Sequence, residues 1–461
     1  MSHPVMDAVR RLLAGQEAWV VGGAVRDRLL GRDTVDLDVS LPADPKPAAR
    51  KLARETGGAS FRLSGDFGAW RVVGPGHAWH VDLVRLRDDD IRADLAARDF
   101  TINAMAQPLD GDDLLDPHGG QADLEARRLR MVGPGSLAAD PLRTLRAVRL
   151  AVDLELSIEP GTAEEIGRRA PELDRVAPER VFGELKQVVC APAARTGLAL
   201  MEAHGITDQV LPELTALRGV DQTVFHHLDV HDHTLAVLDE VVAIERDPVA
   251  AGLGEHAEAV ASRLREPLAD ELTRGGGMRF AALLHDAAKP WTRTELPGGR
   301  VGFPGHDREG AEVARAVLRR LRSSQRLAGY VAALCLHHLR LGFLVHERPL
   351  DRRAVWRYLK ATQPWSVEVT VFTVADRLAT RGRNAEPAIA AHLELAREML
   401  GHALSAEADR PPLVRGDDLA REIGVEPGPR LGEVLATLEE DRFAGAIATR
   451  EDAIRRAREL V

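Results

Sequence analysis

The chain has 461 residues, 45% of them hydrophobic, which is enough for roughly two to four domains with buried cores. Its net charge of −10 excludes nucleic-acid binding through overall charge and leaves only local basic patches. Two cysteines exclude a disulfide framework. The first residues lack the pattern of a signal peptide, and no apolar stretch approaches the roughly 20 residues of a membrane span, so we expect a cytoplasmic protein without a membrane partner.

A glycine turn followed by two aspartates lies near the start of the chain. An apolar strand leads into Gly22 and Gly23, a short helix carries Arg26, and the next strand carries Asp36 and Asp38. Glycines let the backbone approach a phosphate, and residues two apart in a strand share a face. Two neighbouring carboxylates need a cation between them, and oxygen ligands beside phosphates suit Mg²⁺. The pattern predicts a site for a nucleoside triphosphate and Mg²⁺; the alternative is a glycine turn beside a solvated strand edge.

Short strands and turns alternate over residues 18–86. Residues 59–64, 69–73 and 79–84 are predicted strands, and the alternation in the last one places Asp82 on its polar face. Asp82 is therefore either a third carboxylate near the metal or an ordinary exposed aspartate.

Helical patterns begin near residue 90. Asp140 precedes a proline, which predicts the start of a helix, and Arg143, Arg146 and Arg149 recur every three residues on one face of it. One interpretation is a solvated arginine edge. The other is a helix that reads nucleobases, because aspartate accepts hydrogen bonds and arginine donates a rigid fork of them.

Three motifs resemble the class II tRNA nucleotidyltransferase and poly(A) polymerase family, within the polymerase-beta-like nucleotidyltransferase superfamily. They are Gly22-Gly23 through Asp36-Leu37-Asp38, Arg98-Asp99-Phe100-Thr101-Ile102-Asn103-Ala104-Met105-Ala106, and Asp140-Pro141-Leu142-Arg143 through Arg149. Residues 179–186 resemble a later helical motif more weakly, so that the resemblance covers residues 18–220. It implies an α+β head with a mixed sheet, followed by a helical neck and by further helices that grip the tRNA.

The resemblance also implies roles for individual residues. Asp36 and Asp38 would be catalytic and would hold Mg²⁺. Asp140 and Arg143 would face the incoming base. The full set expected to bind the nucleotide is Gly22, Gly23, Arg26, Arg98, Asp99, Asn103, Asp140, Arg143, Arg146 and Arg149.

Two departures from the family bear on nucleotide choice. Ala139 stands where the family usually has glutamate, although Asp140 and Arg143 remain. Only residues 83–97 separate Asp82 from Arg98, where many full CCA-adding members carry a longer loop that is associated with the switch from C to A addition. Because CC-adding members have a shortened loop, we predict addition of CTP as CC. A full CCA-adding enzyme that also uses ATP, and a poly(A) polymerase, remain alternatives.

Histidines and aspartates recur over residues 221–380. The pair His285-Asp286 follows an apolar helical run, and imidazole with carboxylate can bind one metal. The series resembles the HD phosphohydrolase domain, whose metal activates water for attack on a phosphoester. The implied ligands, with the two that permit a second metal placed last, are His233, His285, Asp286, Asp376, His306 and His338. The identity of this divalent metal stays open. The alternatives are a relic domain, or an HD phosphohydrolase acting on RNA ends as the main activity.

We predict four regions: a nucleotidyltransferase head (1–130), a helical neck and body for nucleotide selection and RNA binding (131–220), an HD domain (221–385) and a helical tail (386–461). The polar, glycine-containing segment 252–277 is predicted to be a loop or an excursion within the HD region. The expected partners are a tRNA 3′ end, CTP and ATP, and the sequence indicates no obligate protein partner.

Overall fold

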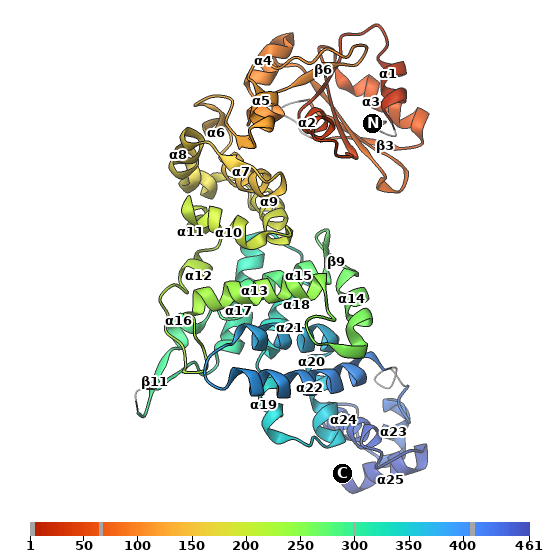
Figure 1. Cartoon of the computed structure of the whole chain (residues 1–461). Coiled ribbons are helices and arrows are strands. Elements are labelled where there is room, and N and C mark those ends of the chain that lie inside the picture. Colours follow the sequence, from red (N-terminus) through yellow and green to blue (C-terminus); the bar gives the residue numbers. More distant parts are fainter. Residues whose placement is uncertain (1–4, 64–67, 299, 406–410) are drawn as a thin grey trace. The chain divides into compact units, whose positions relative to one another are not determined.

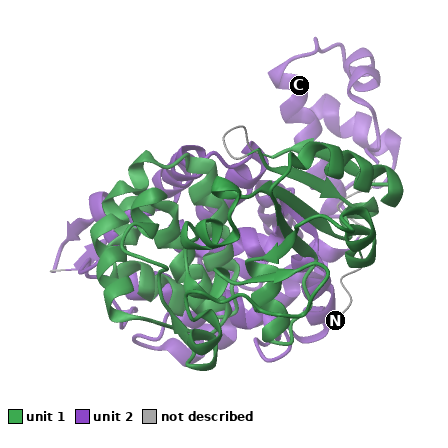
Figure 2. Cartoon of the chain, turned by 90° about the horizontal axis from the view of Figure 1, so that it is seen from above, with its two compact units in different colours: residues 1–210 green, residues 211–461 purple. Residues whose placement is uncertain are grey.

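The computed structural model describes residues 5–63, 68–298, 300–405 and 411–461. The chain divides into two compact units, Met1–Val210 and Leu211–Val461, which are coloured separately in Figure 2. Ser64, at the end of one predicted strand, lies outside the described residues. Each unit is considered by itself below.

A six-stranded mixed sheet with the order β3-β4-β5-β2-β1-β6 forms the N-terminal part of the first unit (Figure 1). β2 and β5 are parallel, and the other neighbours are antiparallel. The strands are β1 (Trp19–Val21), β2 (Asp36–Leu41), β3 (Ala59–Arg62), β4 (Trp70–Val73), β5 (His80–Arg85) and β6 (Ala106–Pro108). Leu37, Val39 and Leu41 are buried, whereas Asp36 and Asp38 alternate with them and share the opposite face.

Helices make up most of the rest of the first unit. α3 is capped by Asp44, whose side chain accepts a hydrogen bond from the Lys46 amide, and it ends at Gly57 in the left-handed conformation. A short parallel pair, β7 (Arg128–Leu129) with β8 (Ser157–Ile158), lies among the helices. The helices are α1 (Met6–Leu12), α2 (Gly23–Leu29), α3 (Pro45–Thr56), α4 (Ile91–Ala96), α5 (Gly120–Glu125), α6 (Ser136–Ala139), α7 (Leu142–Asp153), α8 (Pro160–Arg169), α9 (Pro178–Cys190), α10 (Ala194–Ala203) and α11 (Ile206–Val210).

The second unit is helical apart from two short hairpins, β9 (Pro267–Ala269) with β10 (Leu272–Thr273) and β11 (Thr294–Leu296) with β12 (Arg300–Gly302). α23 to α25 enclose a hydrophobic cluster of their own. The helices are α12 (Pro212–Thr215), α13 (Val230–Arg246), α14 (Ala257–Arg265), α15 (Arg274–Leu284), α16 (Lys289–Thr292), α17 (His306–Arg320), α18 (Gln325–His337), α19 (Arg340–Leu344), α20 (Arg352–Thr362), α21 (Ser366–Ala379), α22 (Ala385–Leu404), α23 (Gly416–Ile423), α24 (Pro429–Phe443) and α25 (Arg450–Leu460). The predicted α+β head followed by all-α regions is thus confirmed.

The segment 252–277 is not a loop, because α14, β9, β10 and the start of α15 occupy it. Of the two alternatives predicted for it, the loop is therefore wrong. Gly275 and Gly277 serve close packing rather than a turn, whereas Gly252 and Gly254 have the positive φ of turn glycines. A Cβ atom on Gly275 would collide with the side chain of Glu245, and one on Gly277 would lie 2.7 Å from Leu268 Cδ2 and 2.9 Å from Tyr330 Cε1.

One stretch of the described chain, Gln325–Glu347, has the length and apolarity of a membrane span, which the sequence reading overlooked. In the structure it is divided between α18, α19 and a 3₁₀ turn. The α18 residues Leu327, Tyr330 and Leu334 are fully buried in the second unit, while 39% of the apolar window as a whole is buried.

Candidate functional site

The carboxylates of β2 lie together on one face of the sheet. Asp36 is exposed and accepts a hydrogen bond at 3.0 Å from Nδ1 of His80. Asp38 lies opposite Asp82 in the parallel register of β2 and β5. Burial raises the pKa of Asp38 to about 6, opposed by Arg98 and reinforced by the charges of Asp82 and Asp36. A divalent cation would relieve this repulsion, so the all-oxygen set of Asp36 and Asp38 fits Mg²⁺.

Gly22 allows an arginine to approach these carboxylates. It has φ +70°, and a Cβ atom there would lie 2.6 Å from Nη1 of Arg98 and 3.4 Å from Oδ2 of Asp38. Arg98 is itself held by Asp94, whose carboxylate accepts a hydrogen bond from Nη2 at 3.2 Å. The Arg98 guanidinium therefore lies beside the carboxylates, where it can neutralise a triphosphate.

Arg26, Asn103 and Asp99 form a hydrogen-bonded network. Arg26 donates to both oxygens of Asp27 at 2.8 and 3.0 Å and to Asn103 Oδ1 at 2.7 Å. Asn103 in turn donates to Asp99 Oδ1 at 3.1 Å. Gly23 is in contact with this network: a Cβ atom on it would lie 3.5 Å from Nη2 of Arg26. These residues of the first two motifs are brought together, and their contacts fix the orientation of α2.

The arginines of α7 have different surroundings. Arg143 donates to the backbone oxygens of Ser136 at 2.9 Å and Ala97 at 3.1 Å, and its Nε is buried without a hydrogen-bond partner. Asp140 accepts hydrogen bonds from Arg180 at both oxygens, from Nη2 at 2.7 Å and from Nη1 at 3.5 Å. Nη1 and Nη2 of Arg143 thus each donate one hydrogen bond to the backbone, which leaves one further N–H group on each of them for a base.

Arg146 and Arg149 both bind Glu184 on α9. Arg146 Nε lies 2.8 Å from Glu184 Oε1, and Arg149 Nε lies 2.6 Å from Oε2. Arg146 also reaches Asp99 Oδ2 at 3.4 Å. Burial opposes ionisation of Asp99, but Arg146 and the hydrogen bond from Asn103 outweigh it and lower its pKa. Arg146 and Arg149 therefore join α7 to α9, a role that neither interpretation of the sequence included.

Asp82 is fully engaged by an arginine. Arg71 on β4 donates to Oδ1 of Asp82 at 2.8 Å and to Oδ2 at 2.7 Å. Asp82 is near Asp38, as a third metal ligand would be, but both of its oxygens are occupied. Its role as a metal ligand remains a prediction.

A cavity of about 860 Å³ in the first unit contains both Arg98 and Arg143 on its wall. We call it the basic cavity, because its described lining includes six basic side chains: Lys46, Arg62, Arg85, Arg87, Arg98 and Arg143. The cavity joins the arginine beside the carboxylates to the arginine of the expected base-reading pair.

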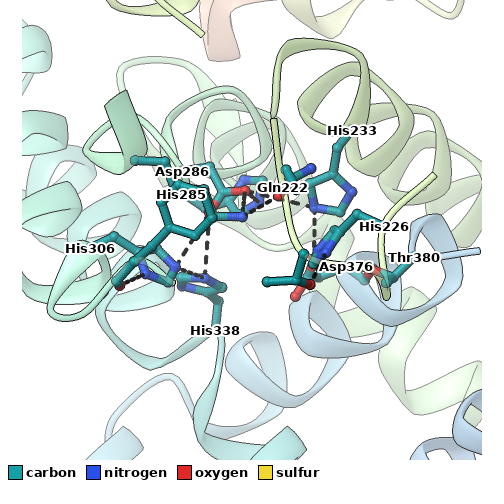
Figure 3. A network of polar contacts seen from close by, with 12 residues as sticks. Gln222, His226, His233, His285, Asp286, His306, His338, Asp376 and Thr380 are labelled. Atoms are coloured by element: carbon teal, nitrogen blue, oxygen red, sulfur yellow. Dashed lines mark hydrogen bonds and ion pairs between the residues drawn. The ribbon is translucent and has the colours of Figure 1, made fainter. Parts of the chain in front are cut away.

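A second polar centre lies in the core of the other unit (Figure 3). Asp286 is at its middle, with Nε2 of His285 at 3.2 Å from one oxygen and Nε2 of His306 at 3.5 Å from the other. His338 Nε2 lies 3.9 Å from Asp286 and 3.3 Å from His306 Nε2. His233 Nε2 lies 3.8 Å from Asp286 and is hydrogen-bonded to Asp376 at 3.1 Å. All six residues expected from the sequence are thus brought together.

The donor atoms of this centre suit a divalent metal. Nδ1 of His285, His306 and His338 faces the backbone oxygens of Ala282, Phe303 and Cys335, at 2.9, 2.6 and 2.6 Å. Nδ1 then carries the proton, and each Nε2 presents a lone pair to the centre. His285 Nε2 and both Asp286 oxygens are buried without a well-formed hydrogen bond. Two triads share Asp286, His233-His285-Asp286 and Asp286-His306-His338, an arrangement that fits one metal or two bridged by the carboxylate.

Lys289 and Gln222 were not expected from the sequence. Lys289 Nζ lies 2.7 Å from Asp286 Oδ2 and donates to Gln222 Oε1 at 2.6 Å. Burial opposes ionisation of Asp286, but His285 and Lys289 hold its pKa well below the usual range. The spacing from Asp286 to Lys289, one helical turn, could have revealed the lysine.

Comparison with known proteins covers most of the chain. A Poly A polymerase head domain matches residues 18–130, a probable RNA- and SrmB-binding site of polymerase A matches 155–217, and an HD domain matches 253–381. An A-adding tRNA nucleotidyltransferase of Deinococcus radiodurans is 37% identical, over 95% of this chain and 94% of the relative. A CC-adding tRNA nucleotidyltransferase of Thermus thermophilus is 33% identical, over 95% and 92%. The fold is similar to that of the Thermotoga maritima CCA-adding enzyme complexed with tRNA, with a TM-score of 0.61, 20% identity and coverage of 99% and 95%.

Proposed function

We propose that this chain, which belongs to the tRNA nucleotidyltransferase and poly(A) polymerase family, adds cytidine nucleotides to the 3′ ends of tRNAs. Membership of this family makes the protein a nucleotidyltransferase. The nucleotide that it adds, and the number of additions, are the proposed part.

The position of Arg143 is the observation that carries this proposal. Arg143 lines the same cavity as Arg98. It lies in the first turn of α7, three residues after Asp140. The pairing edge of cytosine has one amino donor and two acceptors, whereas that of adenine has one donor and one acceptor. Once Arg180 releases it, Asp140 can accept from either amino group, but the fork of Arg143 finds two acceptors only on cytosine. The extra hydrogen bond favours cytosine by about 1 kcal/mol.

Around the triphosphate, the two carboxylates and Arg98 would have different roles. Asp36 and Asp38 would hold Mg²⁺, which, when bound, helps the 3′ hydroxyl of the RNA to attack and steadies the leaving pyrophosphate. Arg98 would neutralise the triphosphate, and Asp94 would keep its guanidinium in place.

A short connection supports termination after two cytidines. β5 ends at Arg85 and α4 begins at Ile91, with only a 3₁₀ turn at Arg87–Asp89 between them. The longer loop associated with A addition has no room in this connection. A-only addition is the second candidate, favoured by the likeness to the Deinococcus radiodurans A-adding relative.

One set of incubations distinguishes these activities. A tRNA lacking its 3′ CCA is supplied with CTP, with ATP, or with both, and a tRNA ending in CC is supplied with ATP. We expect two additions from CTP and none from ATP on either RNA. Extension only of the tRNA ending in CC would show A addition, three residues from both nucleotides would show CCA addition, and a long adenosine tail would show poly(A) synthesis.

We further propose that the centre around Asp286 is a metal-dependent phosphohydrolase for phosphoesters at RNA ends. The shared carboxylate of its two histidine triads supports this activity, and a bound metal would supply an activated water. The test is hydrolysis of a nucleoside 2′,3′-cyclic phosphate after loading with Mn²⁺, Co²⁺ or Ni²⁺, with His285→Ala as the inactive variant. Metal binding without hydrolysis of this probe would contradict the proposed substrate class.

A further inference from the structure

The basic cavity extends well beyond the residues of the nucleotide-binding motifs. Lys46 comes from the first turn of α3, Trp70 from β4 and Arg62 from the end of β3, and all three line the cavity. None of them belongs to the motifs that carry Asp36, Arg98 or Arg143. The nucleoside triphosphate alone therefore leaves part of the cavity wall unexplained.

The charge of the cavity favours a polyanion. Its described lining has six basic side chains and two acidic ones, and both acids already have partners. Asp44 accepts from the amide of Lys46 at 3.0 Å as the cap of α3, and Asp94 accepts from Arg98 at 3.2 Å. Two of the cations are paired as well, Arg98 with Asp94 at 3.2 Å and Arg85 with Asp89 at 3.1 Å. The lining still has more cations than acids, and such an excess draws in phosphates.

Trp70 adds an aromatic surface among these cations. It is half-buried, and Lys46 Nζ and the guanidinium of Arg50 lie 6.0 and 5.8 Å from its ring centroid. Proteins that hold single-stranded nucleic acid combine cations for the backbone with an aromatic ring on which a base stacks. A free triphosphate needs the cations but has no use for an aromatic platform away from its base.

We propose that this part of the basic cavity binds the last single-stranded nucleotides of the RNA substrate, with phosphates against Lys46 and Arg62 and a base against Trp70. The inference rests on the proposed function, because transfer requires the RNA 3′ end and the nucleoside triphosphate to meet at Asp36 and Asp38. Arg98 and Arg143 serve the triphosphate, and the Trp70 region serves the acceptor strand.

The test uses the full chain with the variants Lys46→Ala and Trp70→Ala. Lys51→Ala is the matched control, because Lys51 lies on α3 with its side chain 55% exposed and is not part of the cavity wall. The dissociation constant for a tRNA lacking its 3′ CCA is measured over a range of salt concentrations. CTP binding is measured separately without RNA.

We expect Lys46→Ala and Trp70→Ala to weaken tRNA binding about 5- to 50-fold, with CTP affinity within twofold of wild type. Lys46→Ala should also reduce the slope of log affinity against log salt by about 0.7, whereas Trp70→Ala should not. Trp70→Phe, which keeps a stacking ring, should recover most of the binding and shows that the fold is intact.

Two results for Lys46→Ala and Trp70→Ala would overturn the inference. One is a loss of CTP affinity with tRNA affinity unchanged, and the other is an affinity for CTP and for tRNA equal to that of Lys51→Ala. Wild-type extension of tRNA, run alongside, separates the two proposals. If wild type extends tRNA and the variants bind it normally, only the cavity inference fails; if wild type binds tRNA but does not extend it, the proposed function fails.

Discussion

Arg71 binds both oxygens of Asp82, with Nε at 2.8 Å and Nη2 at 2.7 Å. The pair bridges the antiparallel strands β4 and β5, and Asp82 lies opposite Asp38 on the neighbouring parallel strand. The arginine thus neutralises the carboxylate that lies opposite Asp38 in the sheet. A cation at this site then meets two available carboxylates, those of Asp36 and Asp38.

Asp82→Asn should therefore preserve most of the nucleotide transfer. We expect a rate within about tenfold of wild type, against a loss of more than about 1,000-fold for Asp38→Asn, because direct charge stabilisation of a transition state is worth several kcal/mol. Single-turnover rates at saturating Mg²⁺ make the comparison. Equal losses in the two variants would identify Asp82 as a third metal ligand.

The raised pKa of Asp38 predicts a dependence on pH in the absence of metal. Because its folded pKa of about 6 exceeds the ordinary 3.8, this carboxyl stabilises the fold fully below pH 4 and loses that contribution as the pH rises through 6. Asp38→Asn removes the charge, so at pH 7 we expect the variant to unfold at a higher urea concentration than wild type. Its free energy of unfolding should be larger by at most about 3 kcal/mol. Equal stability of variant and wild type at pH 7 would contradict the burial of this charge. At pH values below 6, the affinity of wild type for Mg²⁺ should decrease, because the proton competes with the metal for the carboxylate.

Glu184 should be important for stability rather than for base selection. Its carboxylate is buried and receives Arg146 and Arg149, whose side chains are 32% and 26% exposed. Glu184→Gln leaves two half-buried cations poorly paired, and we expect a loss of about 2 kcal/mol in urea unfolding. Glu179→Gln, at an exposed position of α9, is the control and should change stability by less than about 0.5 kcal/mol. A Glu184 variant of wild-type stability would show that this contact between α7 and α9 contributes little.

Arg143 should determine which nucleotide is used. Arg143→Ala removes the contact to the base as well as the hydrogen bonds to the backbone oxygens of Ser136 and Ala97. We expect it to reduce the preference for CTP over ATP by about tenfold or more, with tRNA binding nearly unchanged, because the tRNA itself makes no contact with this side chain in the proposed function. Arg143→Lys keeps the charge but not the planar fork, so its preference should fall similarly. The ratio of kcat/KM for the two nucleotides is the measurement. An unchanged ratio in both variants would exclude Arg143 from base reading.

Metal binding in the second unit should be separable from nucleotide transfer. His285→Ala removes one donor beside Asp286 and should lower bound transition metal, measured by elemental analysis, by at least about tenfold. Nucleotide addition with Mg²⁺ should remain within twofold of wild type, and His227→Ala, at an exposed histidine, should change neither property. Loss of addition in His285→Ala with an intact fold would show that the two activities are linked.

Local pattern predicted much of the first unit. The alternation of apolar and polar residues placed Asp36 and Asp38 on one face, and strands were predicted where β4 and β5 occur. The glycines at 275–277 misled the prediction, because glycine marks both a turn and a close approach of packed elements. Only the packing partner, here Glu245, distinguishes the two.

The sequence by itself determined the chemistry of the chain: two carboxylates beside a glycine turn, an arginine-bearing helix and a series of histidines with aspartates. Such features depend on spacing along one strand or helix, which the backbone geometry fixes locally. The tertiary structure decided which charges neutralise one another. Arg71 meets Asp82 through strand register, Glu184 receives Arg146 because α9 packs on α7, and Lys289 reaches Asp286 and Gln222 within the second unit. Ion pairs form between groups that packing brings together, and that is not encoded in the spacing of either partner alone.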